Sequence, residues 1–78
     1  MPRYYLHICN GIGFVEDENG HELPDEEAAR AKAIEGAREL IASEVRDGVM
    51  NLSSFIEVED EDHAHLFTLS FAEAITIK

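Results

Sequence analysis

The sequence predicts an α+β fold with two layers, in which one long helix covers one face of an antiparallel, mostly four-stranded sheet. Residues 28–47 repeat apolar side chains every three to four positions, the period of a helix. The segments on either side alternate apolar and polar residues, the period of a strand. The expected order is strand, strand, helix, strand, strand, and one C-terminal turn could follow. With 78 residues, the chain is expected to form one domain, residues 1–78.

The first two strands are predicted to form a hairpin. Residues 3–9 alternate in polarity, and Asn10-Gly11 favours a type I′ turn that pairs Cys9 with Ile12. The even positions of the first strand are expected to face the core. The opposite face is unusually apolar for a surface in contact with water, since it carries Tyr5, His7, Cys9, Ile12 and Phe14.

The helix has recognisable ends. Asp25 is the best N-cap candidate, and Gly48 suits the position just after the last turn. Its apolar side consists mostly of alanine, which predicts close packing against the sheet. Gly36 lies at the flank of that side, where either close approach to a strand or simple tolerance accounts for it.

The last two strands are expected over residues 54–59 and 64–71. A four-residue loop between them pairs Ile56 with Phe67 and Val58 with His65, whereas a three-residue loop would exchange the two faces. Phe55 and Leu66 are expected to join the apolar open face. Residues 70–73 fit a capping box, which favours one helical turn.

The charge excludes several classes of function. The net charge is −11, and the excess of acids lies in residues 16–27 and 49–63, which contain no lysine or arginine. Phosphate backbones and anionic membranes repel such a surface, so we expect no nucleic-acid and no membrane partner. The acids serve either solubility or the docking of a basic protein partner. The single cysteine, Cys9, excludes an internal disulfide and favours a reducing, cytoplasmic location.

A metal site has only weak support. His63 and His65 are two residues apart on a strand, beside Asp60 and Asp62, and His21 lies in a second acidic turn. Imidazole with carboxylate is a ligand set that zinc and nickel accept, but no further ligand spacing completes it. We therefore expect no cofactor.

An enzyme is not expected either. Catalysis by a nucleophile needs an adjacent base and an oxyanion donor, and Cys9 and His7 on one strand stand side by side instead of facing each other. No phosphate-binding glycine loop is present.

Several segments together resemble a family of short bacterial proteins classed as a domain of unknown function. These are MPRYYLH at residues 1–7, DENGHELPD at 17–25, EAARA at 27–31, IEV at 56–58, DED at 60–62 and LSF at 69–71. The chain departs from the family pattern at His63, where members usually have a turn glycine, and at Ser70, where proline is common. The resemblance implies no activity, catalytic residue or ligand.

The function we expect is a non-enzymatic protein–protein interaction module that forms a homodimer through its open sheet face. Two alternatives remain open at this point. One is a protein that binds a small ligand or a divalent metal through His21, His63 and His65. The other is an antitoxin-like regulator that masks a basic partner.

Overall fold

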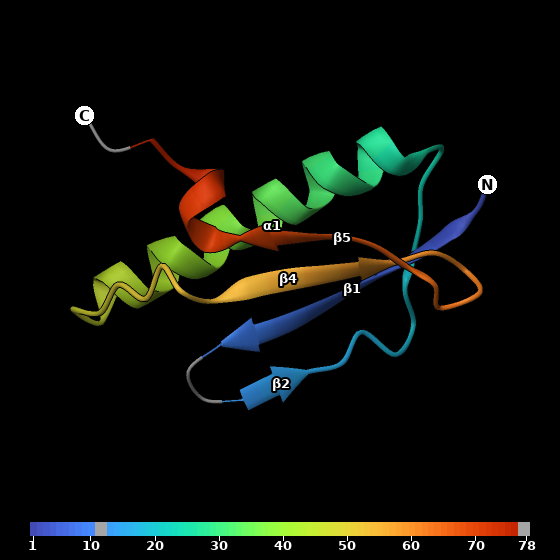
Figure 1. The fold of residues 1–78 in the computed structure, drawn as a ribbon. Helices are drawn as coiled ribbons and strands as arrows, with labels where there is room; N and C mark the ends of the chain where they lie inside the picture. The colour runs from blue at the N-terminus through green and yellow to red at the C-terminus, as the bar shows by residue number, and fades with distance from the viewer. Residues whose placement is uncertain (11–12, 77–78) are drawn as a thin grey trace.

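The computed structural model describes residues 1–10 and 13–76, and it has the predicted α+β architecture (Figure 1). The elements follow one another as β1 (Arg3–Asn10), β2 (Gly13–Val15), β3 (His21–Glu22), α1 (Glu26–Arg46), β4 (Phe55–Glu59), β5 (His65–Ser70) and the 3-10 turn η1 (Phe71–Ala74). The sheet has the order β2-β1-β4-β5, with β3 as a fifth strand on β1, and all pairs are antiparallel. Helix α1 lies across one side of this sheet.

The helix is the element that the sequence predicts best. Asp25 is extended and accepts the Ala28 N–H through its side chain, a cap that typically contributes about 1 kcal/mol. Gly48 has a φ of +81°, the left-handed conformation expected just after the last turn. Of the two explanations offered for Gly36, simple tolerance is the one that fits, because a Cβ built there has no neighbour within 4 Å and no strand approaches closely.

Both predicted hairpin registers are wrong by two residues, although the assignment of faces is right apart from Leu66. Cys9 lies opposite Phe14, and the predicted Cys9–Ile12 pair falls outside the described residues. Ile56 lies opposite Leu69 instead of Phe67, with an irregularity between Val58 and Glu59. A shift of two residues keeps each side chain on its own face, because side chains along a strand alternate with a period of two.

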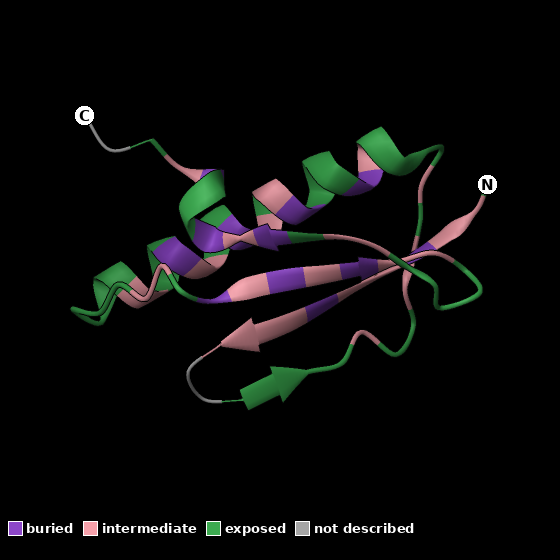
Figure 2. Ribbon diagram, viewed as in Figure 1, coloured by how far each residue is buried: buried purple, intermediate pink, exposed green. Residues whose placement is uncertain are grey.

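The core lies between the sheet and α1. Figure 2 shows the buried positions gathered on the inner side of the helix, on β4 and at η1. Alanines form the helix side of the core, which lets the helix approach the sheet closely. The fully buried side chains are Ala29, Ala33, Ala37, Val58, Leu69, Phe71 and Ala74, joined by Tyr4, Ile41 and Ile56.

The C-terminal turn also forms as predicted, but the capping box does not. Ser70 precedes η1 without a hydrogen bond from its side chain to a backbone N–H, and its hydroxyl donates to the Glu73 carboxylate instead. The turn is held by Phe71, whose N–H donates to the Ser54 carbonyl and whose ring is buried. Tertiary packing therefore replaces the local cap.

Candidate functional site

The sheet face that points away from α1 carries most of the chemistry of the molecule, and we call it the open face. Alternation along β1 and β4 places the odd-numbered residues there, because the even-numbered Tyr4, Ile56 and Val58 belong to the core. Phe14 on β2 joins them through its pairing with Cys9. The open face consists of Tyr5, His7, Cys9, Phe14, Phe55, Glu57 and Glu59.

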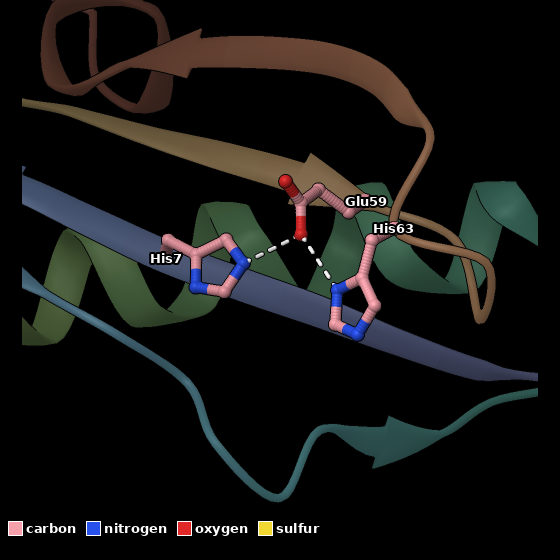
Figure 3. Close-up of side chains that lie close together, drawn as sticks. All are labelled: His7, Glu59 and His63. Carbon is pink, nitrogen blue, oxygen red and sulfur yellow. Dashed lines mark hydrogen bonds and ion pairs between the residues drawn. The ribbon is translucent and has the colours of Figure 1, made fainter.

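One carboxylate on the open face receives two histidines (Figure 3). Glu59 Oε1 lies 2.8 Å from His7 Nε2 and 3.1 Å from His63 Nδ1. His7 is 4% exposed, whereas the His63 side chain is largely in contact with solvent. The three residues come from β1, β4 and the loop after β4, and we call them the histidine–glutamate cluster. Strand pairing of Tyr5 with Glu59 brings them together.

The loop after β4 aims His63 at this carboxylate. Asp60 shapes the loop, because its side chain accepts the N–H groups of Asp62 and Ala64. His63 then adopts a φ of 64°, the conformation for which a turn glycine is normally used. A glycine at this position would have no side chain, whereas His63 places an imidazole there. That imidazole reaches Glu59.

The hydrogen bonds of His7 indicate its tautomer, that is, which ring nitrogen carries the hydrogen. The Asp17 backbone N–H donates to Nδ1 at 3.0 Å, so Nδ1 carries a lone pair and Nε2 carries the hydrogen. Nε2 therefore donates to Glu59. The hydrogen bonds from His7 and then from His63 lower the pKa of the Glu59 carboxyl, and they outweigh the opposing effect of burial.

Aromatic rings surround the cluster. Tyr5 stacks on His63 with ring centroids 4.4 Å apart, and its plane is nearly parallel to that of His7 at 6.3 Å. Phe14 lies against His7 at 5.5 Å while remaining 58% exposed. The open face thus offers aromatic rings to solvent beside a carboxylate whose negative charge is stabilised.

The cluster is a poor metal site despite its composition. The ligand atoms of His7, Glu59 and His63 lie within 4.8 Å of one another, and two histidines with one carboxylate can bind zinc. A metal-binding histidine, however, normally donates its other ring N–H to an acceptor. His7 does the opposite, because Nδ1 accepts the Asp17 N–H and leaves Nε2 protonated. A metal ion at Nε2 would move the ring hydrogen to Nδ1, and Nδ1 could then no longer accept the Asp17 N–H.

The residues predicted as weak metal candidates do not converge. His21 is next to Asp17 at 3.3 Å and lines a groove beneath α1, whereas His65 contacts the Thr68 hydroxyl. Only His63 joins a cluster among the described residues, and its partners are His7 and Glu59. The alternation of side chains along the two strands indicated that His7 and Glu59 share a face. The adjacency of β1 and β4, which the sequence alone does not reveal, was the missing information.

The predicted interface residues are mostly on the open face. Tyr5, Cys9, Phe14 and Phe55 are half-buried or exposed there, whereas His7 is buried beneath its neighbours. The placement of Leu66 on this face is wrong, since it packs against the core beside Phe67. Ile12 lies outside the described residues.

Cys9 is not activated by its surroundings. Burial raises the pKa of the Cys9 thiol, and the nearby Glu57 carboxylate raises it further. The two nitrogens of His7 are engaged by Asp17 and Glu59, so no imidazole nitrogen of His7 is left to accept the thiol proton.

Comparison with known proteins identifies one family. The search of curated proteins and the search of solved structures each found no match. Within the described residues, no helix is long and apolar enough to cross a membrane. The family model "Domain of unknown function (DUF6894)" matches residues 3–72, which include all the described strands, helix α1 and the histidine–glutamate cluster. The chain therefore belongs to the DUF6894 family.

Proposed function

We propose that this protein is a non-enzymatic interaction module that binds a basic segment of another protein through its open face. The observation that carries the proposal is the composition of this face, which combines carboxylates with the exposed ring of Phe14 and the half-buried rings of Tyr5 and Phe55. Aromatic rings attract lysine and arginine side chains through cation–π contacts, and carboxylates attract them by charge. Both kinds of group therefore favour the same partner.

The lysine and arginine side chains that the structure describes are not available to neutralise the open face. Arg3 is the basic residue of β1, and its guanidinium is engaged by Glu22 and by the Asn19 carbonyl. Four of the other bases, Arg30, Lys32, Arg38 and Arg46, belong to α1 in the opposite layer. Glu57 forms no ion pair among the described residues. A basic side chain from a partner would supply what the face lacks.

A second copy of the chain fits this face less well. Face-to-face packing of two copies would bring two Glu57 carboxylates together where no described lysine or arginine is left to pair with them, and unpaired buried charges are costly. The homodimer expected from the sequence stays a prediction, and charge complementarity favours the basic partner over it. The alternative of a regulator that masks a basic protein is one form of the present proposal.

Binding of a defined basic probe tests the proposal. The probe is a dye-labelled peptide of about eight residues that alternates lysine and valine, which matches the length of a typical strand. Fluorescence anisotropy measures its affinity for the wild-type protein and for Glu57→Lys. We expect charge reversal to weaken binding about tenfold, because it replaces attraction by repulsion at the centre of the face.

Glu39→Lys is the matched control, because Glu39 is exposed on α1 and the substitution changes the net charge equally. We expect the control to change affinity by less than about threefold, since solvent screens distant charges. No binding by the wild-type protein, or equal loss in both variants, contradicts the proposal. A dimer in light scattering that Glu57→Lys disrupts would point to a second copy as the occupant instead.

A further inference from the structure

We infer that the basic segment is held as an added strand along the free edge of β5, next to the open face. Since it rests on the proposed function, the inference names how that partner binds. In the sheet order β2-β1-β4-β5, β5 is an outer strand, and no described strand pairs with its other side. Figure 1 shows β5 at the border of the sheet. Unpaired strand edges recruit extended peptides through main-chain hydrogen bonds.

The direction of the β1 backbone groups can be derived from two side-chain contacts. The Leu6 N–H donates to Asp17, which lies on the β2 side of β1, whereas the Arg3 N–H donates to Glu61, which follows β4. The backbone N–H and C=O groups of even-numbered β1 residues therefore point away from β4, and those of odd-numbered residues point toward β4. His7 and Glu57 are opposite each other, so they form a hydrogen-bonded pair.

The same alternation carries across the sheet to β5. Because Glu57 bonds to β1, its neighbours Ile56 and Val58 bond to β5, where Leu69 and Phe67 are their partners. Thr68 lies between those two partners. The backbone N–H and C=O of Thr68 must then point away from β4, toward the free edge of β5. Those of Ser70 point the same way.

Among the described residues, the part of β5 around Thr68 has no lysine, proline or covering strand to protect its edge. Exposed edges are commonly blunted by lysine, by proline or by a covering segment. β5 has the sequence HLFTLS, which contains no proline and no permanently charged residue. Thr68 is exposed. The irregularity between Val58 and Glu59 makes Leu66 the extra residue of β5, and regular pairing resumes at Phe67, before Thr68.

Acidic groups flank this edge on both faces of the sheet. On the helix side, Leu66 and Phe67 form the floor of a groove whose other walls are Glu26, Glu27 and Arg30. On the open face, Glu57 lies opposite Thr68. Side chains of an added strand alternate between these two sides. Basic side chains of an added strand would therefore meet carboxylates on both faces of the sheet. Its aliphatic side chains would meet the apolar floor of the groove on the helix side.

Thr68→Pro tests the inference directly, because it removes an outward N–H and no hydrogen bond to β4. Thr68→Val is the control that keeps the N–H. We expect Thr68→Pro to weaken binding of the lysine–valine peptide at least tenfold and Thr68→Val to change it less than threefold. Equal affinity of the two variants overturns strand addition while leaving binding of a basic segment, and hence the proposed function, intact. Absence of binding by the wild-type protein overturns both.

Hydrogen exchange provides a second measurement that needs no variant. With saturating peptide, we expect the Thr68 amide of the wild-type protein to exchange at least tenfold more slowly, because the peptide backbone then accepts its hydrogen. The exposed helix residue Glu39 provides an amide distant from the edge, whose exchange is expected to stay constant. An unchanged Thr68 rate at saturation overturns the inference, even if Thr68→Pro fails to fold.

Discussion

At the scale of single residues, His7 shows how a polar side chain is buried without loss of hydrogen bonds. Its ring sits beneath Phe14, and its two nitrogens face the Asp17 N–H and the Glu59 carboxylate. Such a buried polar group is tolerated only when its partners are present, because an unpaired one costs about 1–3 kcal/mol. His7 therefore links the loop after β2 to β4.

Glu59→Gln is expected to lower the free energy of unfolding by about 1.5 kcal/mol at pH 7, the scale of a hydrogen bond to a charged group. The pKa of Glu59 is lowered in the folded state from its ordinary 4.5. Its stabilisation is therefore complete above that value and is lost as pH falls through the folded pKa. Urea unfolding of both proteins between pH 7 and pH 3 should show the difference shrinking below about pH 4.5.

Glu39→Gln serves as the control for this titration, since Glu39 is exposed. Its difference from the wild-type protein should stay small across the range. A Glu59→Gln difference that grows as the pH falls would have the wrong sign for a carboxyl with a lowered pKa.

At the scale of elements, one side chain joins the connection between β2 and β3 to the edge of β1. One oxygen of the Asp17 carboxylate accepts the Leu6 N–H and the other accepts the Gly20 N–H. Gly20 has a φ of +69°, and a Cβ there would lie 2.8 Å from Arg3 Cγ and 3.0 Å from the Tyr4 carbonyl oxygen. This turn needs glycine both for its conformation and for space.

Gly36→Ala is expected to raise the free energy of unfolding by about 1 kcal/mol, the difference in helix propensity between the two residues. The added methyl group meets no atom within 4 Å. Chemical denaturation checks the value. Gly20→Ala is the contrasting variant, expected to destabilise by about 1–2 kcal/mol. A loss of stability in Gly36→Ala would mean that the helix packs closer at this point.

At the scale of the whole molecule, charge is distributed between the layers. The four bases of α1 are nearly balanced by its five glutamates, whereas the acidic stretches in the connections and on the open face contain no lysine or arginine. Arg30 itself is held over the Phe67 ring, 4.2 Å from its centroid. The net charge of −11 makes the folded state repel itself, because compaction brings the acids together.

Sodium chloride is therefore expected to raise the midpoint of thermal unfolding by a few degrees at pH 7. Raising the concentration from about 0.02 M to about 0.5 M shortens the Debye length to a few ångströms and screens the repulsion. Circular dichroism follows the transition. Near the pI of about 4.5, where net charge vanishes, the increase should be much smaller. A midpoint that falls with salt at pH 7 would show that ion pairs outweigh the repulsion.

The sequence alone determined the features that depend on short-range rules. The cap at Asp25, the end of the helix at Gly48 and the faces of the strands follow from local conformational preference and from the periods of helix and strand. The composition of the open face is therefore legible from alternation, apart from Leu66. Its acidity can be predicted by counting the charged residues in the sequence.

Only the tertiary structure decided which strands are neighbours and where each pair is in register. The placement of β1 beside β4 brings His7 to Glu59, the irregularity after Val58 turns Leu66 toward the core, and β5 is left at the border. These outcomes depend on contacts between residues far apart in the chain, whose energies compete over many similar pairings. Alternation is preserved under a shift of two residues, so it can establish faces but cannot select the register.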